Sequence, residues 1–254
     1  METPQVLEGA EEFELGAGPV GALLVHGFTG SPQGLRGVGE YLAGRGIAVA
    51  AVRLPGHGTT WQDLNTRTGD EWIDAVEAGF EKISASTDEV FIVALSFGAA
   101  LALDFAARNP DRVAGVVTLA GFVHTNDPRR FLAPVISKLV KSLPAVGNDI
   151  ADPTQREIAY ERLPAAAAYH MLRVVKRART SLPQVTAPIL IMHGRNDHVV
   201  HPRSADIIYN SVASEDKELV YLERSFHVIT LDYDREELLD RTFEFIKNRA
   251  KHAL

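Results

Sequence analysis

Cysteine is absent from the 254 residues of the chain. This absence excludes a disulfide framework, a thiolate metal site and a cysteine nucleophile. Basic residues are also few: 26 lysines and arginines stand against 33 aspartates and glutamates, and the net charge is −7. A nucleic-acid partner is therefore not expected, because recognition of a phosphate backbone requires a basic face.

Long hydrophobic runs are missing as well. The most apolar stretch, residues 114–123, is much shorter than the roughly 20 residues that cross a bilayer. The first five residues contain neither the cationic segment nor the apolar run of a secretory signal. The hydrophobic fraction of 46% and the charged fraction of 23% are ordinary for a globular protein. We expect a cytoplasmic protein with no membrane span, folded as one large domain with an insertion.

Short apolar runs alternate along the chain with segments of helical spacing. The runs are nearly continuous, which is typical of strands covered on both faces. They cover residues 20–25, 47–52, 90–95, 113–119, 189–192 and 219–222, and helical spacing is found over 35–45, 72–83 and 101–108. This repetition predicts an α/β fold with a mostly parallel sheet and helices on both faces.

Residues 122–185 interrupt the alternation. This stretch has helix-like pieces, six prolines and no convincing strand. A structureless loop of that length is unusual in a compact domain. We therefore predict a helical cap over 122–185, inserted into a core of 1–121 and 186–254; the alternative is that its helices belong to the core layer. The apolar residues between 131 and 140 either line an acyl pocket or pack on the core, and packing is favoured.

Ser96 is the candidate nucleophile. It directly follows the apolar run 90–95 and precedes a segment of small residues with helical character. A serine on such a strand-to-helix turn holds its hydroxyl above the carboxyl edge of the sheet, and the turn needs small neighbours. The local pattern is G-x-S-x-G with Ala94 in place of the first glycine.

Two later residues complete a candidate catalytic triad. A serine needs a base, and the base needs a group that orients it. Asp197 and His227 follow the runs 189–192 and 219–222, in the chain order Ser, Asp, His. The carboxyl ends of parallel strands meet at one edge of a sheet, so we expect the three side chains to lie together.

Backbone N–H groups are needed to bind the developing oxyanion. The segment His26-Gly27-Phe28-Thr29-Gly30 follows the first apolar run and is rich in glycine. We predict that the N–H groups of Phe28 and Phe97 form the oxyanion hole. The alternative is that His26 and Gly27 merely end a strand.

With these residues in place, the chain resembles the α/β-hydrolases, and within them bacterial carboxylesterases and monoacylglycerol lipases. The resemblance spans nearly the whole chain. It is carried by segments 24–32, 53–60, 194–200 and 225–232 and by the Ser96 turn, in the order of the family. Ala94 departs from the more common glycine.

The resemblance implies a function. It implies hydrolysis of monoacylglycerols or short- to medium-chain fatty esters through an acyl-enzyme on Ser96, with no cofactor. In segment 156–160, which is similar to a cap segment of the family's lipases, Glu157 corresponds to a glutamate that faces the glycerol group; an exposed surface glutamate is the alternative. A small-molecule ester is the expected partner, and formation of a homodimer is an open possibility.

Other functions fit the same residues. The triad does not fix the leaving group, so hydrolysis of another acyl bond or of a C–C bond is an alternative. A non-catalytic small-molecule-binding protein on the same fold is another. Histidines at 193, 198 and 201 lie near Asp197, but no metal site is expected because Asp197 serves better as the orienting acid.

Overall fold

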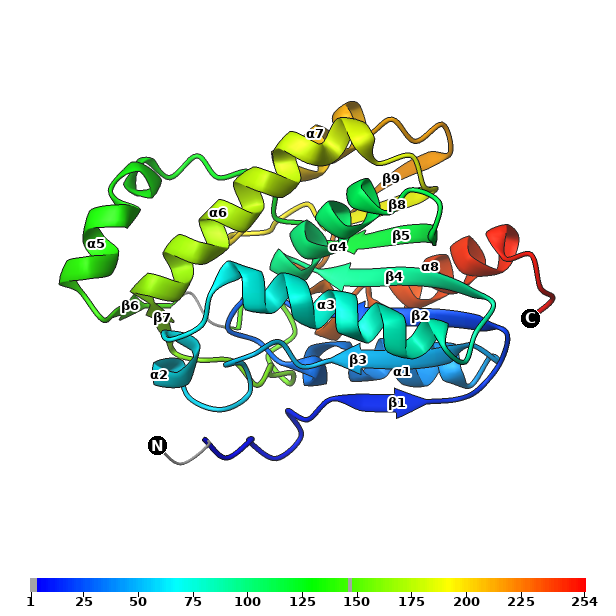
Figure 1. The fold of residues 1–254 in the computed structure, drawn as a ribbon, viewed down its shortest axis with the longest axis horizontal. Coiled ribbons are helices and arrows are strands. Elements are labelled where there is room, and N and C mark those ends of the chain that lie inside the picture. Colours follow the sequence, from blue (N-terminus) through cyan, green and yellow to red (C-terminus); the bar gives the residue numbers. More distant parts are fainter. Residues whose placement is uncertain (1–3, 146–147) are drawn as a thin grey trace.

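The computed structural model describes residues 4–145 and 148–254, without the side chains of Arg129 and Arg130. Its centre is a seven-stranded sheet in the order β1-β3-β2-β4-β5-β8-β9 (Figure 1). Neighbouring strands are parallel except for β1, which is antiparallel to β3. The strands are β1 (Phe13–Leu15), β2 (Val20–Val25), β3 (Ala48–Val52), β4 (Glu89–Leu95), β5 (Val113–Leu119), β8 (Ile189–Gly194) and β9 (Lys217–Leu222). The predicted fold class, a mostly parallel sheet within an α/β architecture, is confirmed.

Helices cover both faces of the sheet. In Figure 1, α3 and α4 lie in front of the sheet, and α1 and α8 lie behind it. Each face has its own apolar core, one including Leu23, Trp72 and Phe105 and the other Leu24, Leu42 and Phe245. The helices of these layers are α1 (Arg36–Ala43), α3 (Gly69–Ser84), α4 (Phe97–Arg108), α7 (Arg203–Ser211) and α8 (Arg235–Arg249), and the chain also forms 3-10 turns at Pro32–Leu35 and Ile229–Leu231. The short helix α2 (Trp61–Leu64) lies beyond the arrowheads of the strands rather than over a face of the sheet (Figure 1).

The chain changes direction across the sheet between β2 and β4. After β2 it adds β3 on one side, and from β4 onwards it adds β5, β8 and β9 on the other. Such a reversal leaves a crevice at the carboxyl ends of the strands, where open α/β sheets bind their ligands. The arrowheads of β3 and β4 point toward the side of Figure 1 where α5, β6 and β7 lie. The sheet therefore presents its ligand-binding edge to the segment between β5 and β8.

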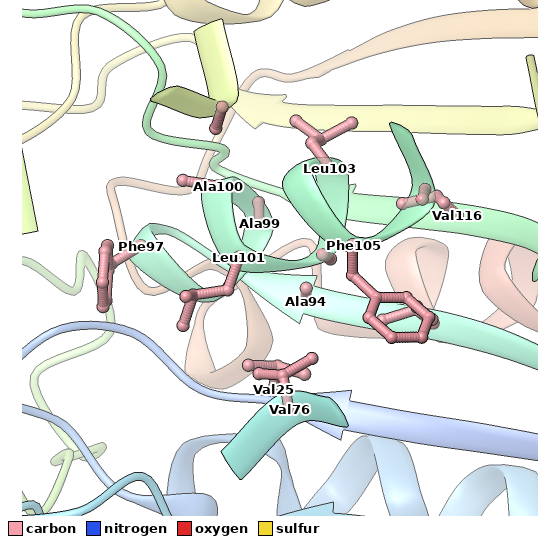
Figure 2. Close-up of a cluster of buried hydrophobic side chains, with 14 of the residues drawn as sticks. Val25, Val76, Ala94, Phe97, Ala99, Ala100, Leu101, Leu103, Phe105 and Val116 are labelled. Atoms are coloured by element: carbon pink, nitrogen blue, oxygen red, sulfur yellow. The ribbon is translucent and has the colours of Figure 1, made fainter. Parts of the chain in front are cut away.

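Helix α4 is buried on nearly all sides. Figure 2 shows Ala99, Leu101 and Phe105 projecting from α4 around the strand that carries Ala94. Every residue from Phe97 to Ala106 is buried. The helix contains many alanines. Because their side chains are small, the backbone of α4 can lie close to the backbones of β4 and α6. A rigid, close-packed α4 fixes the turn that precedes it.

The segment between β5 and β8 contains more structure than the sequence predicted. Two short strands, β6 (Ser142–Pro144) and β7 (Arg162–Pro164), pair antiparallel, so the expectation of no strand here is wrong. The remaining elements are α5 (Ala133–Leu139), α6 (Ala165–Ser181) and 3-10 turns at Pro128–Phe131 and Leu182–Gln184. Helix α6 packs across α4, and Arg177 donates to the buried Asp104 at 2.7 Å. The cap boundaries 122–185 stay a prediction.

The apolar residues of α5 and its flanks do not pack on the core. Phe131 is 72% exposed and Leu139 is 79% exposed, and Leu132 and Val135 also lie at the surface. The expectation that they pack is therefore wrong. Helical spacing shows which residues share a face, but it does not show what covers that face.

Among the described residues, no helix is long and apolar enough to cross a bilayer. Residues 1–3, on which part of the signal-peptide prediction depends, lie outside the described residues.

Candidate active site

Ser96 occupies a strained turn between β4 and α4. Its φ of 53° and ψ of −114° lie in a region that residues with a side chain rarely adopt. The turn is held on both sides: the N–H of Ser96 donates to the carbonyl of Leu119 at 2.8 Å, and its own carbonyl accepts from Phe122. At Gly98 a Cβ would lie 2.3 Å from the carbonyl oxygen of Val25, so only glycine lets α4 begin this close to β2. Strain maintained in this way is typical of functional sites.

Ser96, His227 and Asp197 lie in one hydrogen-bonded chain. The Oγ of Ser96 is 2.9 Å from Nε2 of His227. The Nδ1 of His227 is 2.7 Å from Oδ2 of Asp197. All three residues are buried, with 8% of each exposed. The three residues that the sequence singled out separately are therefore brought together, in a geometry that can carry a proton from the serine to the histidine.

The carboxylate of Asp197 is fully engaged. Its Oδ1 accepts from the N–H groups of Val199 and Val200 at 2.8 and 2.7 Å. Its Oδ2 also lies 3.1 Å from Nε2 of His193, one of the histidines for which the sequence predicted no metal-binding role. Burial would raise the pKa of Asp197, but the hydrogen bonds from His193 and His227 outweigh burial and hold that pKa well below its usual range. Asp197 is therefore ionised and fixed in orientation.

Gly194 lets the two loops that carry Asp197 and His227 meet. A Cβ at this position would lie 2.1 Å from the carbonyl oxygen of Phe226. Any other residue would push the loop after β8 away from the loop after β9. The close approach explains why a glycine stands at the end of β8.

The charge state of His227 depends on opposing effects. Burial lowers its pKa, while the hydrogen bond to Asp197 and the negative charges of Asp197, Glu157 and Asp149 raise it, and the net direction is upward. The imidazolium that forms when His227 takes a proton is therefore stabilised by its surroundings. In the resting enzyme the base must be neutral, so activity is expected to fall at acidic pH.

The candidate oxyanion hole lies beside Ser96. A Cβ on Gly27 would come within 3.2 Å of the Cβ of Ser96, which places the following residue, Phe28, at the nucleophile. Phe97 is the first residue of α4, so its N–H has no intrahelical acceptor. For Phe28 and Phe97 alike, no hydrogen-bond acceptor for the N–H is found among the described residues.

An aromatic cluster supports these two N–H groups. The rings of Phe28 and Phe97 pack edge to face at 5.7 Å, and each also packs against Trp72. Trp72 is fully buried, and its indole N–H donates to the carbonyl of Pro55 at 3.0 Å. The sequence pattern does not indicate this role, because the three aromatics are far apart in the chain. The cluster fixes the spacing of the two backbone donors.

Two buried histidines lie behind the same loop. Burial lowers the pKa of His26 to about 4 and holds the pKa of His57 well below its usual range, so both are neutral. The Nε2 of His26 accepts from the N–H of Leu54 at 3.1 Å. The ring of His57 packs on Phe28 at 5.7 Å. These contacts join the loop 53–60 to the oxyanion segment.

Glu157 lies against Gly30 of the oxyanion segment and Gly34 of the 3-10 turn that follows. A Cβ on Gly30 would lie 2.5 Å from its Oε1, and one on Gly34 would lie 3.2 Å from the same atom. The residue is half-buried rather than exposed. Burial raises the pKa of its carboxyl group to about 7, and the charge of His227 acts in the opposite direction. The glutamate is therefore near the triad, and burial favours its protonated form.

We expect Glu157→Gln to stabilise the protein at alkaline pH. The pKa is about 7 in the folded chain against an ordinary 4.5, so the folded state binds more protons between these values and loses stability as pH rises. A shift of this size corresponds to about 3 kcal/mol as an upper limit. The measurement is the free energy of unfolding at pH 4.5 and pH 8: the advantage of the variant should appear only at pH 8. The control Glu161→Gln, at an exposed glutamate nearby, should show no such change; an equal advantage at both pH values would contradict the prediction.

The histidines near Asp197 have partners other than a metal. The Nε2 of His193 donates to the carbonyl oxygen of Val200 at 2.9 Å and lies 3.1 Å from Oδ2 of Asp197. His198 pairs through Nδ1 with Asp149 at 2.8 Å. The Nδ1 of His201 accepts from the N–H of Arg203. Within the described part of the chain, no group of three or more His, Cys, Asp or Glu residues is placed to hold a metal ion.

Comparisons with known proteins identify the family of the chain. Residues 21–234 match a family model, Hydrolase_4, described as "Serine aminopeptidase, S33". A thermostable monoacylglycerol lipase of Bacillus sp. (strain H-257) is 38% identical over 250 residues, covering 98% of this chain and 97% of the relative. A carboxylesterase of Bacillus subtilis (strain 168) is 27% identical, covering 92% and 95% of the two chains.

Solved structures give the same result for the fold. A structure reported for the metagenome-derived lipolytic enzymes LipS and LipT has a TM-score of 0.93 at 37% identity, covering 96% of this chain and all of that one. A monoacylglycerol lipase of Paleococcus ferrophilus superposes with a TM-score of 0.79 at 19% identity, which supports the fold alone. The family match and the relatives together show that the chain belongs to the serine aminopeptidase S33 family of α/β-hydrolases.

Proposed function

We propose that the protein is a serine ester hydrolase that cleaves monoacylglycerols by acyl transfer to Ser96. The observation that carries the proposal is the hydrogen-bonded chain from Ser96 through His227 to Asp197. The likeness to a monoacylglycerol lipase and to a carboxylesterase supports the same reaction class.

The reaction follows from the positions of these groups. His227 takes the proton of Ser96 as the Oγ attacks the ester carbonyl, and Asp197 keeps the histidine in the required tautomer. The N–H groups of Phe28 and Phe97 bind the oxyanion, and they stay fixed because their rings pack on Trp72. His227 then gives the proton to the departing alcohol. Water attacks the acyl-enzyme with His227 again as the base, and no cofactor takes part.

Glu157 is our candidate for recognition of the alcohol. Its carboxyl group lies against Gly30, on the segment that carries Phe28, and against Gly34 in the turn that follows. With its pKa raised to about 7 by burial, the group can donate as well as accept a hydrogen bond near neutral pH. The two free hydroxyls of a monoacylglycerol need partners of this kind. A simple alkyl or aryl ester lacks these hydroxyls.

We expect Glu157→Ala to lower kcat/KM for a monoacylglycerol by about tenfold, since one or two hydrogen bonds are worth roughly 1.4 kcal/mol. The p-nitrophenyl ester of the same acyl chain should change little, because it has no hydroxyl to recognise. Glu157→Gln should keep much of the preference, because an amide also donates and accepts. The measurement is the ratio of the two kcat/KM values, which a general loss of stability does not change. An unchanged ratio in Glu157→Ala would contradict the monoacylglycerol assignment and leave the esterase assignment in place.

The alternatives named from the sequence are separated from this proposal by simple assays. A non-catalytic binding protein would not turn over a chromogenic ester. A hydrolase of amides or of C–C bonds would prefer those substrates over the ester of the same acyl group. The cytoplasmic location and the homodimer stay predictions.

A further inference from the structure

Asp149 contacts both of the loops that carry the triad. It lies in the segment that returns from α5 and β6 toward the sheet edge. Its carboxylate accepts from the N–H of His198, the residue after Asp197, at 3.0 Å, and from the N–H of His227 at 3.2 Å. Its main-chain carbonyl accepts from His227 as well, at 3.0 Å, and from Val228 at 3.1 Å. One residue from the cap region therefore joins the loop after β8 to the loop after β9.

We propose that Asp149 is a positioning residue, whose carboxylate holds the Asp197 and His227 loops together so that His227 reaches both Asp197 and Ser96. This proposal rests on the proposed function, because it assigns Asp149 a role in the same reaction. Among the described residues, no hydrogen bond joins Asp149 to Ser96. Asp149 acts through the backbone of the catalytic histidine.

The contact is built into the fold rather than made by a free surface side chain. The Asp149 side chain is 10% exposed, whereas its ring partner His198 is 59% exposed. The segment is also held just beyond Asp149, where the carboxylate of Asp232 accepts from the N–H groups of Ala151 and Phe226 at 2.8 and 2.9 Å. The approach of this segment to the His227 loop is thus fixed at two neighbouring points.

The residue before Asp149 links the same segment to Glu157. Asn148 adopts a positive φ of 51°, which bends the chain, and its Oδ1 accepts from the N–H of Glu157 at 2.7 Å. Asparagine is among the residues that tolerate this conformation best. The bend places the acid that contacts His227 directly beside the segment that carries the candidate alcohol-binding glutamate.

Asp149 also contributes charge. The groups whose charges act on His227 are Asp197, Glu157 and Asp149, all of which favour the imidazolium, while burial opposes it. Removal of the charge at 149 is therefore expected to lower the pKa of His227. The acid limb of the kcat/KM profile should then move to lower pH, because the base stays neutral over a wider range.

Two substitutions of Asp149 distinguish the effect of its carboxylate hydrogen bonds from the effect of its negative charge. Asp149→Ala removes the carboxylate contacts and the charge, and Asp149→Asn removes the charge but keeps an oxygen that accepts from His198 and His227. The matched control is Asp152→Ala, in the same segment, where the carboxylate accepts from Thr154 within its own turn. Each rate on a p-nitrophenyl ester is divided by the concentration of Ser96 that a fluorophosphonate titrates. This division removes any contribution of unfolded protein.

We expect Asp149→Ala to lower kcat by about tenfold, with KM within about twofold. Asp149→Asn should recover most of kcat at pH 8, and both variants should show an acid limb at lower pH than the wild type. Asp152→Ala should match the wild type in kcat and in the acid limb. If Asp149→Ala does not fold, the acid limb of Asp149→Asn decides: a shift supports the proposal and no shift overturns it.

Two results would overturn the role of Asp149 without touching the proposed function. One is that both Asp149 variants match Asp152→Ala in kcat and pH profile. The other is an equal loss of kcat in Asp149→Ala and Asp149→Asn, which would leave no geometric effect of the carboxylate. Failure of the proposed function looks different, because the wild type itself would then not turn over the ester or not be labelled at Ser96.

Discussion

Replacement of Ser96 by alanine is expected to lower ester turnover by about 10⁶-fold, the largest effect of any single substitution considered. Removal of the Oγ leaves His227 without a nucleophile to activate. The fold should be retained, because the bonds that hold the turn run through the main chain of residue 96 to Leu119 and Phe122. Alanine meets the same positive φ as serine, so no new strain is added. The measurement is kcat on a p-nitrophenyl ester, with the thermal unfolding midpoint as the check on folding.

Covalent labelling gives the matching control. A fluorophosphonate should modify Ser96 in the wild type and leave Ser96→Ala unmodified, as read by mass spectrometry of the intact protein. Ser84→Ala should be labelled and active like the wild type, since Ser84 ends α3 next to the start of β4, at the opposite edge of the sheet. Turnover that persists in Ser96→Ala, or labelling at another serine, would contradict the assignment of the nucleophile.

The parallel strands were predictable because each is long enough to carry its own signal. The apolar runs at 20–25 and 113–119 coincide with β2 and β5, and the runs at 47–52 and 90–95 differ from β3 and β4 by one residue. A strand that is buried on both faces needs apolar residues at nearly every position, and a continuous apolar run is visible in the sequence. Strand β1 has only three residues on the sheet edge, too few for a period to appear.

Strands β6 and β7 could not be predicted for a related reason. Each has three residues, and prolines stand at their ends, Pro144 and Pro164. Proline is depleted in strands because it cannot donate to the ladder. Their pairing joins residues about twenty positions apart in the chain, and no local property of either segment specifies that partner.

The residues of the candidate site also differ in how far the sequence could predict them. Ser96, Asp197 and His227 each follow a strand, so topology alone brings them to one edge, and the sequence predicted them. Asp149 follows no strand of the central sheet, and its contacts depend on the path of residues 148–161, which form no helix or strand. His193 lies on β8, four residues before Asp197, where a strand histidine is ordinarily a packing residue. Its contacts with Asp197 and with the carbonyl of Val200 depend on the turn that follows the strand.

Replacement of Asp197 by asparagine is expected to lower kcat by about 10⁴-fold, because the variant reverses the hydrogen bond to His227. The N–H groups of Val199 and Val200 both point at Oδ1, so the amide oxygen of the asparagine will take that position. Its NH₂ group then faces Nδ1 of His227 and donates to it. The histidine is thereby fixed with its proton on Nε2, and Nε2 can no longer accept the proton of Ser96.

The measurement for Asp197→Asn is kcat at saturating ester, with KM expected to stay within about threefold because the acid does not touch the substrate. The control is Asp234→Asn: the Oδ2 of Asp234 accepts from the N–H of Arg224 and the hydroxyl of Ser225 rather than from the His227 ring, so turnover should be nearly that of the wild type. Asp232, the other acid near the histidine, is likewise occupied by main-chain N–H groups, such as those of Phe226 and Tyr233. Full activity in Asp197→Asn would therefore leave His227 with no carboxylate in position to orient its ring, and the proposed proton transfer would have to be abandoned.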